Sequence, residues 1–200
     1  MQEYWNQRYK DNEIVYGYAP NEFLKEFIDK NKPGTILFPA EGEGRNSIYA
    51  AQKGWTATAF DFSEVAKEKA LQMAAQKNLT INYTIDGLDT YQAPEQFNAI
   101  ALIYVHMPPA LRTAVHNKMI QALKPGGYLV LEAFSKSQLG KQSGGPTDIN
   151  LLFDTDTLSS DFATLDIIQL ESIETTLKEG PYHEGPASIV RLLAMKKPTN

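Results

Sequence analysis

The chain has 200 residues, a length that fits one domain with a core large enough to fold without cross-links. It contains no cysteine, which excludes disulfides, thiolate metal sites and a cysteine nucleophile. The formal net charge is −5, no basic run is sustained and no apolar segment approaches the length of a membrane span, so we expect a cytoplasmic protein with neither nucleic acid nor a membrane as its partner.

The N-terminal part of the sequence predicts two helices. Their apolar and polar residues alternate with helical spacing over Glu3–Tyr9 and Glu22–Asp29. A turn-rich stretch at residues 17–21 separates them. We expect no strand before residue 35.

A small-residue turn follows the first predicted strand. The apolar run Thr35–Pro39 is typical of a buried parallel strand, and Arg45–Lys53 is compatible with a helix. Between them, at residues 40–44, glycines let the backbone approach a ligand without a side chain in the way. Strand, turn and helix in this order direct backbone N–H groups and a helix N-terminus at one ligand.

An acid ends the second predicted strand. Trp55–Phe60 is apolar and Asp61 follows directly, 21 positions after Ala40, which is close to the spacing at which an acid meets a ribose hydroxyl. The turn nevertheless departs from the dinucleotide fingerprint, because the third glycine is missing. It also carries Glu41 and Glu43, which disfavour a phosphate-rich ligand and suit a neutral or cationic one.

The rest of the chain alternates helices and strands. Helices are predicted at Val65–Lys77 and Pro109–Leu123, and strands at Ile81–Ile85, Phe97–Tyr104, Tyr128–Phe134, Thr164–Ile173 and Ala187–Met195. A glycine-rich spacer at 179–186 permits an antiparallel hairpin between the last two strands. The sequence therefore predicts one α/β domain over 1–200, with a doubly wound, seven-stranded, mostly parallel sheet that ends in an antiparallel hairpin.

At this point the sequence resembles the class I S-adenosylmethionine-dependent methyltransferases, which have a Rossmann-like fold. Their first motif has the form acid-x-Gly-x-Gly-x-Gly, and an LxPGG turn, here Leu123–Gly127, precedes their fifth strand. Two positions depart from the motif: Phe38 stands where the acid is usual and Ala40 where the first glycine is usual. The methionine end of the cofactor must then be held differently. Within the family, residues 42–46 and 179–194 look most like the tellurite-resistance and thiopurine-type small-molecule branch.

The resemblance implies S-adenosylmethionine as the cofactor. Asp61 would bind the ribose, Asp86 the adenine amino group, and Leu88 would offer a backbone N–H and an apolar face to the adenine. The full set of implied cofactor-binding residues is Ala40, Glu41, Gly42, Gly44, Arg45, Asp61, Phe62, Asp86, Gly87, Leu88 and Tyr104. The resemblance also implies that residues 1–30 form a helical lid over the cofactor. The polar, glycine-rich segment 135–148 predicts a mobile loop.

Two histidines are candidate catalytic residues. His106 follows the fourth predicted strand and His183 lies in the hairpin spacer, so both are expected to border the acceptor pocket, whereas His116 is expected at the surface. Three scattered histidines without cysteine predict no metal site. Methyl transfer needs mainly alignment, and a base is required only if the nucleophile must lose a proton, so a thiolate or selenide acceptor would need none.

Three hypotheses follow from the sequence. The first is methyl transfer from S-adenosylmethionine to a small molecule, possibly a thiol, selenium or tellurium species. The second is an NAD(P)-dependent oxidoreductase, and the third is a non-catalytic S-adenosylmethionine-binding domain. The sequence predicts neither the acceptor nor the oligomeric state.

Overall fold

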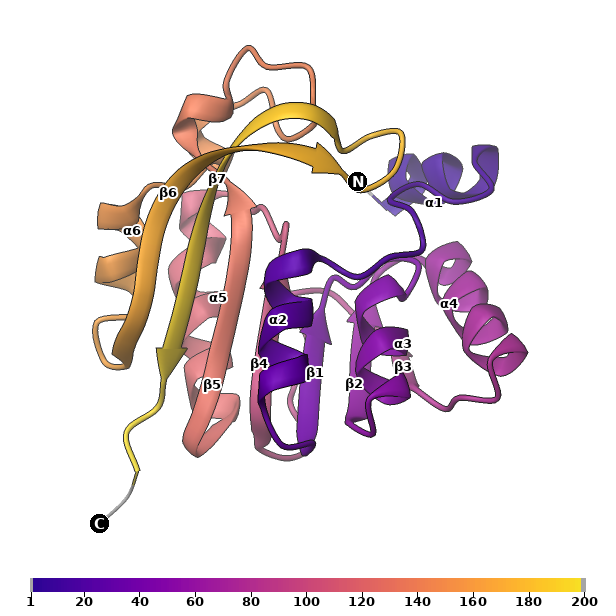
Figure 1. Cartoon of the computed structure of the whole chain (residues 1–200), viewed down its shortest axis with the longest axis horizontal. Coiled ribbons are helices and arrows are strands. Elements are labelled where there is room, and N and C mark those ends of the chain that lie inside the picture. Colours follow the sequence, from indigo (N-terminus) through magenta and orange to yellow (C-terminus); the bar gives the residue numbers. More distant parts are fainter. Residues whose placement is uncertain (1, 199–200) are drawn as a thin grey trace.

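The computed structural model describes residues 2–198 and contains one seven-stranded sheet with helices on both faces (Figure 1). The strands are β1 Thr35–Pro39, β2 Thr56–Asp61, β3 Asn82–Ile85, β4 Phe97–Ile103, β5 Leu123–Phe134, β6 Asp166–Lys178 and β7 Glu184–Met195. The helices are α1 Gln2–Asp11, α2 Glu22–Lys30, α3 Arg45–Gln52, α4 Glu64–Gln76, α5 Pro109–Ala122 and α6 Thr155–Asp161, with single 3-10 turns at Lys136–Gln138 and Ile149–Leu151.

The strand order is β3-β2-β1-β4-β5-β7-β6. The first five strands are parallel, and β7 is antiparallel to both of its neighbours. The order reverses between β1 and β4, and in such sheets ligands bind beyond the carboxyl ends of the strands at this reversal. The predicted doubly wound sheet with a terminal antiparallel hairpin is confirmed.

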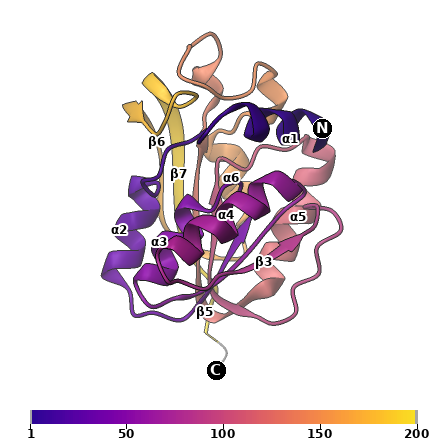
Figure 2. The ribbon, with the colours of Figure 1, turned by 90° about the vertical axis from the view of Figure 1, so that its right-hand side faces the viewer.

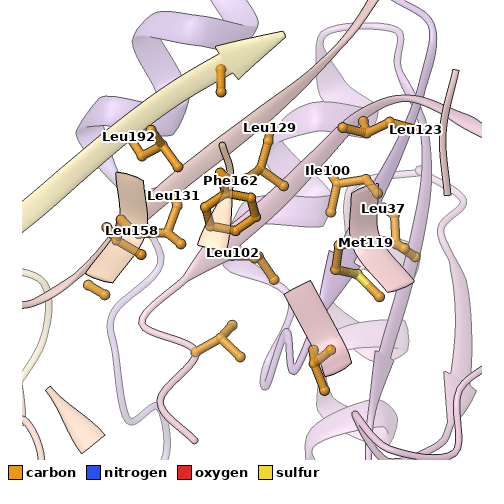
Figure 3. Close-up of a cluster of buried hydrophobic side chains, with 14 of the residues drawn as sticks. Leu37, Ile100, Leu102, Met119, Leu123, Leu129, Leu131, Leu158, Phe162 and Leu192 are labelled. Atoms are coloured by element: carbon orange, nitrogen blue, oxygen red, sulfur yellow. The ribbon is translucent and has the colours of Figure 1, made fainter. Parts of the chain in front are cut away.

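The central strands are apolar on both faces because helices cover both sides of the sheet. Successive residues of β1 point to opposite sides: Phe38 lies in the core under α2, α3 and α4, and Leu37 in the core under α5 and α6. Figure 3 shows the second of these cores, where Leu37 and Ile100 lie near Met119 of α5. Burial of these side chains on both faces fixes the register of the sheet.

Three segments meet beyond the carboxyl ends of the parallel strands. Figure 1 shows α1, the segment that follows β5 and the β6–β7 turn gathered at the top of the sheet, and Figure 2 shows the same arrangement from the side. Residues 136–153 are fastened there, since Lys136 N–H donates to the Phe153 carbonyl at 2.8 Å. This edge is where the candidate site must be sought.

The structure changes four details of the sequence-based prediction. β5 begins at Leu123, whereas a turn was expected over Leu123–Gly127 and the strand from Tyr128. The last two strands are longer than expected, since β6 continues to Lys178 and β7 begins at Glu184, which shortens the turn to residues 179–183. Helix α6 was not expected; it is short and polar, and Asp154 caps it by accepting from Thr157 N–H at 2.7 Å. His116 was expected at the surface and is buried, because its Nδ1 lies 2.8 Å from Asp161 Oδ2 between α5 and α6.

Candidate active site

The turn after β1 has the conformation that close approach of the backbone to a ligand requires. Ala40, Gly42 and Gly44 all have positive φ angles, of 50°, 65° and 87°. The Gly42 N–H donates to Asp61 Oδ2 at 3.1 Å, and the Gly42 carbonyl accepts from the Tyr83 hydroxyl at 2.6 Å. A Cβ atom on Gly42 would lie 2.7 Å from the Tyr9 hydroxyl oxygen. A side chain at Gly42 would therefore displace the Tyr9 hydroxyl and strain the backbone, and α1, which carries Tyr9, lies directly over the turn.

The two acids expected to bind the cofactor lie side by side. The Asp86 N–H donates to the Asp61 carbonyl at 3.1 Å, which continues the β2–β3 pairing to the sheet edge. The Asp61 carboxylate is buried and also accepts from Ser63 N–H at 2.9 Å. Burial raises the pKa of Asp61, and the backbone N–H groups of Ser63 and Gly42 oppose this rise. The Asp86 carboxylate accepts from Gly87 N–H at 2.8 Å.

Glu41 occupies the N-terminus of α3. Its Oε1 accepts from the backbone N–H groups of Asn46 at 3.1 Å and Ser47 at 2.6 Å. Burial raises the pKa of Glu41 to about 7, although the N–H of Ser47 opposes the rise. Because a carboxylate already fills this position, the helix terminus is closed to a phosphate.

Glu43 points away from the ligand side of the turn. Its two carboxylate oxygens hold the N-terminal segment, one accepting from Val15 N–H at 2.8 Å and the other from Lys69 Nζ at 2.9 Å. Of the two acids in the turn, only Glu41 is therefore placed to influence which ligand binds. Glu43 instead holds the N-terminal segment against α4.

A core residue, Phe38, occupies the position at which the family usually has an acid. Phe38 is 1% exposed and packs beneath α2 and α3. Arg45, the first residue of α3, reaches across the sheet edge to Glu179, with 2.8 Å between Nη2 and Oε2. Burial opposes ionisation of Glu179, yet the neighbouring His183, whose Nδ1 lies 3.8 Å from Oε2, and the charge of Arg45 lower the pKa of Glu179 to about 2. A charged pair therefore stands at the edge of the site.

Three further predicted cofactor residues lie around this turn. Gly44 is the N-cap residue of α3, the Phe62 carbonyl accepts from Gln2 Nε2 at 2.7 Å, and Leu88 is partly buried against the core under α5. Their contact with the cofactor stays a prediction.

Tyr104 ends the central strand in a strained conformation. Its φ is 54°, and its hydroxyl donates to the buried carboxylate of Glu132 at 3.0 Å. Burial raises the pKa of Tyr104, and the charge of Glu132 raises it further. Non-glycine residues with a strained backbone of this kind are often found at functional sites.

Both ring nitrogens of His106 are engaged. Nδ1 lies 2.8 Å from the Leu151 carbonyl, so it carries the proton, and Nε2 accepts from Phe134 N–H at 3.3 Å. Burial lowers the pKa of His106 to about 4. To remove a proton from an acceptor the imidazole would have to give up one of these bonds, so its catalytic role stays a prediction.

His183 is buried among aromatic rings. Its centroid lies 4.5 Å from that of Tyr16, 4.4 Å from Tyr104 and 5.1 Å from Phe134. Burial lowers the pKa of His183, although the carboxylate of Glu179 opposes this. Phe134 also stacks on His106 at 5.8 Å, so the structure brings both predicted histidines and Tyr104 into one cluster.

A buried polar network beneath this cluster was not predicted from the sequence. The Asn21 side-chain amide donates to Glu132 Oε1 at 2.6 Å and to Glu179 Oε1 at 3.0 Å, and Arg191 Nε donates to Glu132 Oε2 at 2.6 Å. The one available signal was Glu132 itself, a charged residue inside the apolar run 129–134. Its partners come from distant parts of the chain and leave no pattern.

Two cavities lie outside this cluster. One of about 320 Å³ lies between α5 and the segment before β4, and one of about 140 Å³ lies between α3 and α4 and is bordered by Arg45. Among residues 2–198, no cluster of histidine and carboxylate side chains is arranged to hold a metal ion. Over the same residues, no helix combines the length and the apolar character that crossing a membrane requires.

Comparison with known proteins agrees with this geometry. Residues 36–127 match the methyltransferase domain family. The chain is 24% identical over 138 residues to a 2-heptyl-1-hydroxyquinolin-4(1H)-one methyltransferase of Mycobacteroides abscessus, in a match that covers 67% of this chain and 61% of that protein. The chain thus spans less than two thirds of this curated relative.

Two solved structures share the fold. TehB from Haemophilus influenzae superimposes with a TM-score of 0.77 at 17% identity, covering 98% of this chain and 67% of TehB. A second structure concerns the conversion of a disulfide bond into a thioacetal group during echinomycin biosynthesis. It superimposes with a TM-score of 0.81 at 15% identity, and the match covers 100% of this chain and 93% of that chain. Residues 36–127 thus match the methyltransferase domain family, and these relatives together with the sheet order support a class I S-adenosylmethionine-dependent methyltransferase.

Proposed function

We propose that the protein transfers the methyl group of S-adenosylmethionine to a small-molecule acceptor. The observation that carries this proposal is the capped N-terminus of α3. Glu41 accepts from the N–H groups of Asn46 and Ser47, where a dinucleotide would place its pyrophosphate. S-adenosylmethionine has a ribose, which Asp61 can bind, and no phosphate. The NAD(P)-dependent alternative loses its main anchoring point.

The finer proposal concerns the acceptor, which we take to be a soft sulfur, selenium or tellurium nucleophile. When bound, S-adenosylmethionine supplies an electrophilic methyl carbon on a sulfonium that departs as a neutral thioether. A thiolate brings its own electron pair, so no protein group has to take a proton. This suits a site whose His106 already uses both nitrogens. The protein then contributes alignment and exclusion of water.

The proposal gives a role to three residues. Asp61 accepts hydrogen bonds from the ribose hydroxyls, Gly42 keeps the backbone side of the cleft open, and Tyr104 lies at the edge of β4 between cofactor and acceptor. The hydroxyquinolone named for the curated relative is a planar ring with an N-hydroxyl group. An acceptor of that kind is the second candidate, and its oxygen would need a base.

Calorimetry tests the cofactor. We expect S-adenosylhomocysteine to bind and NADH not to bind. In Asp61→Asn the affinity for S-adenosylhomocysteine should fall by roughly 10- to 100-fold, because charge-assisted hydrogen bonds to the ribose are lost. Asp29→Asn is the control, since Asp29 is a carboxylate near the end of α2 that accepts from the Tyr49 hydroxyl and has no part in the proposed site, and it should leave the affinity unchanged. Binding of NADH in place of S-adenosylhomocysteine would overturn the proposal.

Turnover tests the reaction. Purified protein and labelled S-adenosylmethionine are offered an aliphatic thiol, an aromatic thiol, selenite and a hydroxyquinolone. We expect methylation of at least one sulfur or selenium acceptor, with little dependence on pH once the nucleophile is ionised. Tight cofactor binding without methyl transfer to any of the four would favour the non-catalytic hypothesis instead.

A further inference from the structure

The side chain of His183 fills an aromatic cage. The walls of the cage are Tyr16 from the N-terminal segment, Tyr104 after β4 and Phe134 at the end of β5. All three centroids lie within 5.1 Å of the imidazole, and the residue is only 6% exposed. The protein thus already holds a planar nitrogen ring at the edge where an acceptor would bind.

The occupant of the cage is poorly satisfied. His183 Nδ1 is buried and finds no hydrogen-bond partner within the part of the chain that the structure describes. The nearest carboxylate oxygen, Oε2 of Glu179, lies 3.8 Å away, beyond hydrogen-bond distance. A buried nitrogen without a partner destabilises the arrangement that contains it. Tyr104, by contrast, is tied to Glu132 at 3.0 Å. The wall residue Tyr104 is thus anchored through its side chain, whereas His183 is held through its backbone, by bonds to the Gly180 carbonyl and the Glu179 N–H.

The segment that carries His183 has its own pivots. His183 lies in the turn between β6 and β7, and Gly180 and Gly185 flank it with φ angles of 86° and 107°. A Cβ atom on Gly180 would lie 2.6 Å from the backbone nitrogen of Gly17, so the turn rests against the segment that carries Tyr16. Withdrawal of His183 about these glycines would break the two backbone hydrogen bonds within the turn and open the adjoining Lys178–Glu184 and Leu177–Gly185 pairs, and it would leave the rest of the β6–β7 ladder paired.

We propose that His183 is an internal plug, and that a planar nitrogen heteroaromatic molecule replaces its imidazole between Tyr16, Tyr104 and Phe134. The incoming ring gains the same tilted and edge-to-face ring contacts and directs an N–H group at Glu179, which Arg45 holds in place at 2.8 Å. The inference rests on the proposed function in one respect, namely that this ring is the methyl acceptor. A heteroaromatic thiol would satisfy both proposals, because its ring fits the aromatic cage and its sulfur is a soft nucleophile.

Binding without cofactor tests the plug. The probe is benzimidazole, with cyclohexanol as a non-aromatic control, titrated by calorimetry. We expect wild type to bind benzimidazole, and His183→Ala to bind it at least about tenfold more tightly because the closed state no longer competes. Tyr16→Leu should weaken binding about fivefold through the loss of one ring contact. Tyr18→Leu, at a nearby exposed tyrosine, should leave it unchanged.

Hydrogen exchange in the wild-type protein gives an independent readout that needs no variant to fold. Benzimidazole should speed the exchange of amides 179–183, because the turn must leave its resting place. Slower exchange there, together with weaker binding in His183→Ala, would make His183 a wall of the site and overturn the plug. Failure of both wild type and His183→Ala to bind benzimidazole would also overturn it.

Turnover of 2-mercaptobenzimidazole separates this inference from the proposed function. If benzimidazole displaces the turn but 2-mercaptobenzimidazole is not methylated, the plug proposal is supported and the proposal that the bound ring is the methyl acceptor is overturned. If an aliphatic thiol or selenite is methylated and neither His183→Ala nor Tyr16→Leu changes kcat/KM, the reaction stands and the cage has no part in it.

Discussion

Ala40 holds a backbone conformation that costs free energy for any residue with a Cβ atom. Its φ of 50° lies in the left-handed region, where a non-glycine residue is disfavoured by about 1–2 kcal/mol. We expect Ala40→Gly to leave the free energy of unfolding unchanged or to raise it by about 1 kcal/mol, since relief of strain offsets the greater freedom of glycine in the unfolded chain. Urea denaturation measures the difference.

Ala59→Gly is the matched control for this change. Ala59 is equally small, is fully buried and lies in the middle of β2, where the backbone is extended. Glycine there should lower the free energy of unfolding by about 1 kcal/mol. An equal loss at Ala40 would mean that the left-handed turn stores no strain.

The individual site residues differ in how far the sequence could reveal them. Asp61 and Asp86 could be predicted to lie together because each follows a predicted strand and neighbouring parallel strands end at the same sheet edge, and the structure places them side by side. The role of Glu43 could not be predicted from the sequence, because its partners, Val15 and Lys69, lie 28 and 26 positions away. Only the docking of the N-terminal segment onto α4 brings them together.

Helix α3 depends on a carboxyl group with an unusual ionisation. The folded-state pKa of Glu41, about 7, lies above the ordinary 4.5. Between these values the folded protein binds more protons than the unfolded chain, so the contribution of Glu41 is complete below about pH 4.5 and is lost as the pH rises through about 7. We expect wild type to lose 1–3 kcal/mol relative to Glu41→Gln over this range, on the order of the shift in pKa.

Glu41→Gln is suited to this comparison because its amide oxygen can still accept from the N–H groups of Asn46 and Ser47. Urea denaturation at several pH values between 4 and 8 measures the gap between the two proteins. A gap that stays constant across the range would show that burial does not raise the pKa of Glu41. A gap of opposite slope would show that the helix terminus lowers it.

At the scale of elements, long apolar runs were predictable and short polar ones were not. β4 was recognised because both faces of a central strand must be apolar. α6 was missed, since its seven residues bury only Leu158 and form no repeating stripe. The burial of His116 follows from α6, because Asp161 at the end of that helix is its partner.

On the scale of the whole molecule, the N-terminal segment touches both halves of the proposed site. Tyr9 lies over Gly42 on the cofactor side, and Tyr16 is a wall of the cage on the acceptor side. Arg8 stacks on Tyr182 of the hairpin turn, 4.6 Å from the ring centroid. A lid that spans cofactor and acceptor would couple their binding, and residues 1–30 remain our predicted lid.

Lys69 is the point at which this segment is fastened to the body of the protein. Its Nζ donates to the carbonyls of Tyr9 at 2.5 Å and Asn12 at 2.6 Å, and pairs with Glu43 at 2.9 Å. In Lys69→Met we expect amides 2–15 to exchange with solvent roughly tenfold faster, because about 1.4 kcal/mol of hydrogen bonding is lost. S-adenosylhomocysteine should also dissociate faster.

Lys67→Met is the control, since Lys67 lies two residues earlier in α4 and forms no ion pair within residues 2–198. It should change neither exchange nor dissociation. If Lys69→Met frees the N-terminal segment while the cofactor dissociates at the wild-type rate, α1 is a structural helix and not a lid. If both rates rise together, opening of this segment limits the exit of the cofactor, and the single lysine sets how often the site opens.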